Sequence, residues 1–133
     1  MEFAILASRT VLSKYATFSG RASRPEFWWW VLSITVILAI TRLIDGVIIA
    51  PLLGFDTFQS GSGQPLSFLI SLAVILPNIA VAMRRLHDIG KSGWWLLIAL
   101  LPVIGFLVLI YFYIQPSDKG DNEFGPQQPL NAP

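Results

Sequence analysis

Three stretches of the chain are each long and apolar enough to cross a bilayer as a helix: Phe27–Ile49, Leu66–Met83 and Trp94–Ile114. A membrane-spanning helix needs about 20 mostly apolar residues. Hydrophobic residues make up 54% of the 133-residue sequence and charged residues only 13%. Because so little polar sequence remains to cover three such helices in water, the bilayer is the expected solvent of this protein.

We predict an all-α integral membrane protein with three transmembrane helices plus an N-terminal amphipathic interfacial helix, in a single membrane domain. Apolar residues recur at spacings of three and four within the interfacial arm, residues 1–22. That pattern is typical of a helix in the membrane interface, but a helix packed on the aqueous side of the bundle would share it. Helices that include the spans are expected over 24–49, 66–89 and 93–114. A polar tail over 115–133, rich in Pro and Gly, is expected to be extended or poorly ordered unless something binds it.

Local signals mark the helix ends and leave one span open to two interpretations. Ser23 and Glu26 form a capping box that starts the first membrane helix, and Ser92 is a candidate N-cap for the third. Pro102 and Gly105 lie near the middle of the third segment, where they would permit a re-entrant hairpin. Aromatic residues at both ends of this segment favour a full span instead.

The distribution of Lys and Arg predicts the orientation of the chain. Loops on the cytoplasmic side of a membrane carry an excess of these residues. The Gly54–Pro65 loop has none, so the sequence predicts a multi-pass protein with a cytoplasmic N-terminus and, for three spans, an external C-terminus. A re-entrant hairpin in the third segment would reverse the side of the tail alone. The basic residues that support this orientation are Arg9, Lys14, Arg21 and Arg24 before the first span and Arg84, Arg85 and Lys91 after the second.

One basic residue lies at the outer edge of the first apolar segment. Arg42 and Asp45 are three residues apart and could pair on one helix face. The favoured interpretation is that Arg42 extends to the lipid headgroups, because ion pairs within a membrane are rare.

Two basic segments, residues 21–30 and 84–95, share the same order along the chain: basic residues, then an acid, then tryptophans. Brought together, they would form one ionic layer under a tryptophan belt, with surplus positive charge facing phosphate headgroups; two independent interfacial anchors are the alternative. His87 is expected to have a structural role, although a proton relay or an anion site is also consistent with its neighbours. The candidate polar layer is Arg21, Arg24, Glu26, Arg84, Arg85, His87, Asp88 and Lys91, and the candidate interfacial anchors are Trp28, Trp29, Trp30, Trp94 and Trp95.

Polar residues inside the second span offer a further candidate. Ser67, Ser71 and Asn78 lie near one helix face and could line a solute path, but hydrogen bonding between helices is the favoured interpretation. The chain has no Cys and only one His, and it contains no phosphate-binding Gly loop or established catalytic motif. We therefore expect no catalytic residue, no metal site and no cofactor.

Three motifs resemble the signatures of a known family: Phe18–Trp28, Arg84–Trp95 and Gly120–Pro126. They resemble the signatures of the domain of unknown function 805 family, which comprises YhaH-like small bacterial inner-membrane proteins. The motifs occur in the same order as in the family, with membrane segments between them. The resemblance covers nearly the whole chain. It implies a multi-span protein of the bacterial inner (cytoplasmic) membrane and supplies no reaction, ligand or catalytic residue.

The expected function is that of a non-enzymatic scaffold, assembly or sensing protein with an Arg/Trp-rich cytoplasmic face. An oligomeric transport or channel subunit is the alternative. The expected partners are the lipid bilayer, including anionic headgroups, and a second copy or another membrane protein. No interaction with nucleic acid is expected.

Overall fold

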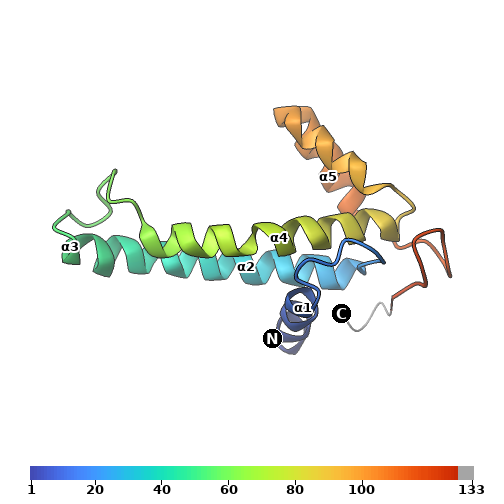
Figure 1. The fold of residues 1–133 in the computed structure, drawn as a ribbon, viewed down its shortest axis with the longest axis horizontal. Coiled ribbons are helices and arrows are strands. Elements are labelled where there is room, and N and C mark those ends of the chain that lie inside the picture. The colour runs from blue at the N-terminus through green and yellow to red at the C-terminus, as the bar shows by residue number, and fades with distance from the viewer. Residues whose placement is uncertain (129–133) are drawn as a thin grey trace. The chain divides into compact units, whose positions relative to one another are not determined.

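The computed structural model describes residues 1–128, which are helical apart from connecting segments (Figure 1). Helix α2 runs without interruption into the π-helical turn η1 and then into the short helix α3. The elements in chain order are α1 (Glu2–Ser13), α2 (Arg24–Ile44), η1 (Asp45–Ile49), α3 (Ala50–Leu52), α4 (Pro65–Asp88), the 3₁₀ helix η2 (Gly93–Leu100) and α5 (Pro102–Ile114).

Within the described part of the chain, two helices are long and apolar enough to cross a membrane. They comprise Arg24–Leu52, with 29 residues, and Pro65–Asp88, with 24 residues. Only 22% and 28% of their apolar windows are buried within the protein. A core helix of a water-soluble protein would be mostly buried, so the exposed apolar flanks favour a lipid environment.

The chain divides into two compact units, described separately. Unit 1 comprises Met1–Val31 and Leu76–Pro133, and unit 2 comprises Leu32–Ile75.

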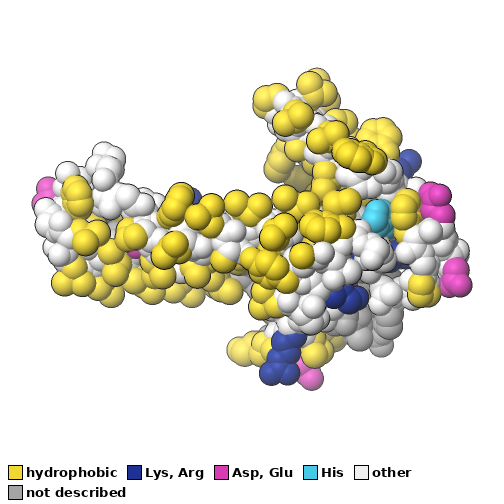
Figure 2. All heavy atoms as spheres, viewed as in Figure 1, with side chains coloured by type: hydrophobic (Ala, Val, Ile, Leu, Met, Phe, Trp, Pro, Cys, Tyr) yellow, Lys and Arg dark blue, Asp and Glu magenta, His cyan; other side chains and the backbone are white. Residues whose placement is uncertain are grey.

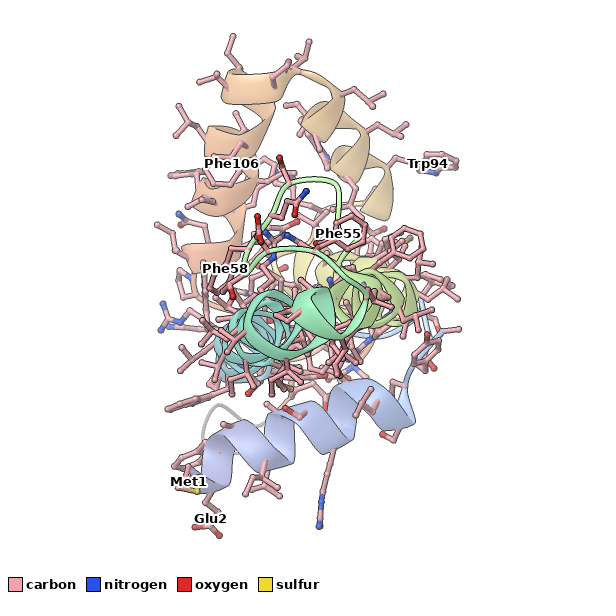
Figure 3. The ribbon with its side chains drawn as sticks, turned by 90° about the vertical axis from the view of Figure 1, so that its left-hand side faces the viewer. Met1, Glu2, Phe55, Phe58, Trp94 and Phe106 are labelled. Carbon is pink, nitrogen blue, oxygen red and sulfur yellow. The ribbon has the colours of Figure 1, made fainter. Side chains whose placement is uncertain are left out.

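In unit 1, α1 lies across the paired ends of α2 and α4 (Figures 1 and 3). Ala7 and Val11 form its buried face, and the ring of Phe3 stacks on Trp29 at 6.4 Å. Trp30 is only 3% exposed, and its Nε1 donates to Asn78 Oδ1 at 2.7 Å. The prediction of Trp30 as an interfacial anchor is wrong, because its ring packs between helices.

The third apolar segment is not a single helix. η2 and α5 lie side by side as a hairpin (Figures 1 and 3) that reverses at Leu101, just before Pro102. A Cβ atom at Gly105 would collide with the carbonyl group of Ile98, so only glycine permits this close approach. The expected continuous helix over 93–114 is therefore wrong, and the hairpin that Pro102 and Gly105 permitted is formed instead.

In unit 2, the buried carboxylate of Asp45 caps the start of α4. Its two oxygens accept from Leu66 N at 3.1 Å and from Ser67 N at 2.6 Å. An acidic cap satisfies free amide groups of the first turn and complements the helix dipole. Phe58 covers Gly46, where a larger side chain would meet the Phe58 ring, and its amide donates to the Gly46 carbonyl.

Candidate functional site

The end of α4 in unit 1 holds five buried charged residues, which we call the arginine–carboxylate cluster: Arg21, Glu26, Arg84, Arg85 and Asp88. Each is at most 1% exposed. Arg84 Nη1 lies 2.6 Å from Glu26 Oε1, Arg21 Nε lies 3.0 Å from Asp88 Oδ1, and Arg85 Nη1 lies 2.7 Å from Asp88 Oδ2. The structure thus places residues from the N-terminal arm, α2 and α4 in one ionic layer.

Local sequence positions these groups. The i,i+3 spacing puts Arg85 and Asp88 on one face of the last turn of α4. Ser23 Oγ accepts from the Glu26 amide at 3.3 Å, so Ser23 caps α2. The Glu26 carboxylate, which a full capping box would direct back to the Ser23 amide, instead pairs with Arg84.

Arg21 joins the C-terminal tail to the end of α4. Its Nη1 donates to Gly120 O at 2.7 Å and to Gly125 O at 3.2 Å. Its Nη2 donates to Asp118 O at 2.7 Å and to Asp88 O at 3.2 Å. Because Nε is already paired with Asp88, every nitrogen of this guanidinium has an acceptor.

Arg85 closes the C-terminal end of α5. Its Nε donates to Tyr113 O at 3.2 Å, and its Nη2 donates to Gln115 O. The last carbonyl groups of a helix lack partners within the helix, and a cation there also complements the helix dipole. Trp28 Nε1 donates to the same Tyr113 carbonyl at 3.2 Å, so α2 and α4 both hold this helix end.

Arg84 is the least satisfied member of the cluster. Among the described residues its Nε and Nη2 are buried without a hydrogen-bond partner. Three guanidinium groups face two carboxylates, so one positive charge remains in excess. Carbonyl oxygens around Arg21 and Arg85 offset part of that charge, whereas a buried donor without a partner costs about 1–3 kcal/mol.

The two other predicted basic residues of this layer lie outside the cluster. Arg24 is exposed and donates to Ile114 O at 3.2 Å. Lys91 Nζ lies 6.0 Å from the ring of Trp95 and 5.7 Å from that of Phe112, within cation–π range. The expectation that surplus charge of the layer would face phosphate headgroups is wrong for the three cluster arginines, because they are buried.

The tryptophans of the hairpin are exposed. Trp94 is 79% exposed and Trp95 is 42% exposed, and Figure 3 shows Trp94 directed away from the hairpin. Ser92 Oγ accepts from the Trp94 amide at 3.3 Å, so the predicted N-cap at Ser92 is confirmed, although it starts a 3₁₀ helix.

His87 is held between the N-terminal arm and the tail. Its Nδ1 lies 2.9 Å from Gly20 O, and since a carbonyl oxygen only accepts, Nδ1 carries the hydrogen. The ring stacks on Phe124 with centroids 4.2 Å apart and planes 2° apart. Asn122 Nδ2 donates to the His87 carbonyl at 2.9 Å.

The tail is folded onto this site as far as it is described. Asp118 N donates to Asp88 O at 2.8 Å, and Ser117 Oγ donates to Asp88 Oδ2. The sequence predicts a tail that is extended or poorly ordered unless something binds it; Arg21 and the end of α4 bind it over 115–128, and residues 129–133 lie outside the described part. This docking fits the hairpin alternative for the third segment, in which the tail lies on the same side as the Arg84–Lys91 loop.

The model of the family described as "Protein of unknown function (DUF805)" matches residues 15–126, which include the whole cluster and its docked tail. The chain belongs to the DUF805 family. This membership agrees with the resemblance carried by its three motifs.

Two curated relatives of this DUF805 protein are Escherichia coli (strain K12) proteins named "Inner membrane protein". YhaH is 38% identical over 120 residues, covering 90% of this chain and 93% of YhaH. YhaI is 39% identical over 116 residues, covering 87% of this chain and 89% of YhaI. A more distant relative, the uncharacterized protein YiiR, is 27% identical over 99 residues, covering 70% of this chain and 53% of YiiR. No solved structure matches the chain.

Sequence reasoning missed the tail as part of this site. Asn122, Ser117 and Phe124 lie in a polar segment without helical period, so no local pattern links them to α4. The signal that could have found Asn122 and Phe124 is the Gly120–Pro126 motif, since a motif shared with a family suggests a fixed structure; Ser117 lies outside that motif.

Proposed function

We propose that this DUF805 protein is a non-enzymatic scaffold of the bacterial inner membrane, with an aqueous end held rigid by the arginine–carboxylate cluster. The observation that carries the proposal is that the charged groups of the cluster are buried and engaged with the N-terminal arm, α2, α4 and the tail. A catalytic acid or base must come within hydrogen-bond reach of its substrate. Groups enclosed in this way stabilise a fold instead.

In this proposal α2 with its extension to Leu52, and α4, cross the bilayer. The η2–α5 hairpin enters one leaflet and returns to the same side. The 13 residues of α5 extend about 20 Å at 1.5 Å per residue, less than the roughly 30 Å hydrocarbon core. The exposed apolar side chains of the hairpin (Figure 2) are suited to lipid contact.

With two spans and a hairpin, the excess of Lys and Arg in unit 1 favours a cytoplasmic position for both the N-terminal arm and the tail. The Gly54–Pro65 loop, which has neither residue, lies outside. This orientation replaces the external C-terminus predicted from three spans.

The proposed partners are the lipids of the bilayer, and a second copy or another membrane protein packed against the exposed flanks of α2 and α4. Association of membrane helices relies on close packing and on hydrogen bonds between helices. The cations of unit 1 that remain available to anionic headgroups are Arg9, Lys14, Arg24, Lys91 and Lys119.

The test compares protein stability with a cellular phenotype in a strain that lacks the chromosomal copy. A conservative cluster variant, Glu26→Gln, is expected to lower both the folded amount and the phenotype, and a suppressor substitution that restores the folded amount is expected to restore the phenotype. A Glu26→Gln protein that folds to the wild-type level yet has no activity in cells would overturn the structural role of the cluster and favour a chemical one. The matched control is Glu123→Gln, which removes an exposed carboxylate from the tail.

A further inference from the structure

Unit 2 contains an open cavity of about 210 Å³ that the scaffold role does not use. Since a water molecule takes up about 30 Å³ of the liquid, the cavity has room for a polar group larger than one water. Its lining combines a guanidinium, hydroxyl groups and the exposed ring of Phe68. The lining residues are Arg42, Gly63, Gln64, Ser67, Phe68 and Ser71.

The nearest acid along the helix does not neutralise Arg42. The spacing of Arg42 and Asp45 would allow them to pair, but both carboxylate oxygens of Asp45 accept from the amide groups at the start of α4. Among residues 1–128 no salt bridge to Arg42 is formed. The π-helical turn η1 starts at Asp45, and such turns occur often at functional sites.

The serines at this cavity differ in availability. Ser67 Oγ lies 3.4 Å from Thr41 Oγ1 and is buried. Ser71 lies one turn further along α4, is only half-buried and lines the same cavity. Its hydroxyl group can therefore donate to an acceptor held by Arg42.

Arg42 also lies at the depth of a membrane interface if α2 spans the bilayer. Eighteen residues of continuous helix separate Arg24 from Arg42, which corresponds to about 27 Å along α2 and approaches the roughly 30 Å thickness of the hydrocarbon core. Phospholipids present phosphate at this depth, and the planar guanidinium of arginine binds phosphate through two parallel hydrogen bonds.

We propose that this cavity binds the phosphate group of a phospholipid in the leaflet on the side of the Gly54–Pro65 loop. Arg42 supplies the charge and Ser71 a hydroxyl donor, while the acyl chains follow the exposed apolar side chains of Phe68 and Leu72 on α4. This assignment rests on the proposed membrane placement and not on the scaffold role.

The test uses native mass spectrometry of the full chain in detergent with three probes: phosphatidylglycerol, a glucosyl diacylglycerol that lacks phosphate, and inorganic phosphate. Arg42→Gln is expected to weaken phosphatidylglycerol binding about tenfold, since a hydrogen bond to a charged group is worth about one factor of ten or more. Ser71→Ala is expected to weaken it less and also guards against a folding defect in Arg42→Gln. The matched control Arg9→Gln removes an exposed arginine of α1 that does not line the cavity, and it is expected to weaken binding clearly less than Arg42→Gln, because an exposed charge contributes only about 0–1 kcal/mol.

Equal binding of phosphatidylglycerol by the wild type and Arg42→Gln would overturn the site. An equal loss in Arg42→Gln and Arg9→Gln would also overturn it, since the attraction would then depend only on overall charge. Equal binding of the phosphate-free glycolipid would overturn the role of phosphate. Saturation by inorganic phosphate without any lipid would overturn the lipid assignment in favour of a free anion. A scaffold role could fail in cells while each of these binding results stands.

Discussion

Replacing Asp88 by Asn removes one negative charge from the centre of the arginine–carboxylate cluster with almost no change in shape. The two carboxylate oxygens pair with Arg21 Nε at 3.0 Å and with Arg85 Nη1 at 2.7 Å, and all three side chains are 0% exposed. Loss of the carboxylate would leave both guanidinium groups buried without a counter-charge. Breaking a buried pair in this way costs about 3–5 kcal/mol.

The assay is thermal unfolding of purified protein in detergent. At several degrees per kcal/mol for a chain of this size, Asp88→Asn is expected to lower the melting temperature by roughly 10 °C or more. The matched control is Asp121→Asn, which changes an exposed carboxylate of the tail. Exposed ion pairs are worth about 0–1 kcal/mol, so the control is expected to melt close to the wild type.

Ionic strength provides a second readout, because salt screens exposed charges far more than buried ones. The wild-type melting temperature is expected to change little between low and high salt. If Asp88→Asn melts within about 2 °C of the wild type, or if salt alone removes the difference, the reasoning is refuted: water would then reach these groups and replace the lost carboxylate.

Three further outcomes are expected. Cysteines placed singly at Glu123 and at Ser60 should be labelled from opposite sides of the membrane, with Glu123 on the cytoplasmic side; external labelling at Glu123 would contradict the hairpin. His87→Gln should keep a donor for the N-terminal arm and lose only about 1 kcal/mol of stability. His87→Leu should lose clearly more, as measured by calorimetry of both variants. Equal losses would show that the hydrogen bond from Nδ1 contributes nothing. Gly105→Leu places a side chain against the Ile98 carbonyl and should open the hairpin. The opening would be seen as faster protease digestion of the hairpin. Unchanged digestion would mean that the two helices do not need this contact.

Apolar runs and helix caps in the sequence predicted the two long helices well. The expected helix over 24–49 corresponds to α2 with its continuation to Leu52, and the expected helix over 66–89 differs from α4 by one residue at each end. Length and apolar composition decide such helices locally, and Ser23 fixes the start of α2. The shared order of the two basic segments suggested the ionic layer but left two independent interfacial anchors open, and only the structure shows the buried pairs.

The hairpin and the docked tail could not be decided in that way. A proline and a glycine within an apolar segment permit either a kinked span or a reversal, and the packing of Gly105 against Ile98 is a property of the folded chain. The tail binds through Arg21, nearly a hundred residues earlier in the sequence. Hydrogen bonds over such a separation leave no periodic pattern in either segment.

The docking of the tail on Arg21 also has a consequence for the synthesis of the chain. The ribosome makes Arg21 early, but the carbonyl groups of Gly120 and Gly125 that receive its Nη1 are made last. Both long helices are therefore complete while this guanidinium still lacks three of its five acceptors, the carbonyl groups of Asp118, Gly120 and Gly125. A chain interrupted between Asp88 and Asp118 would retain the pair of Arg21 and Asp88 without the tail, and it would expose a charged surface that the docked tail covers.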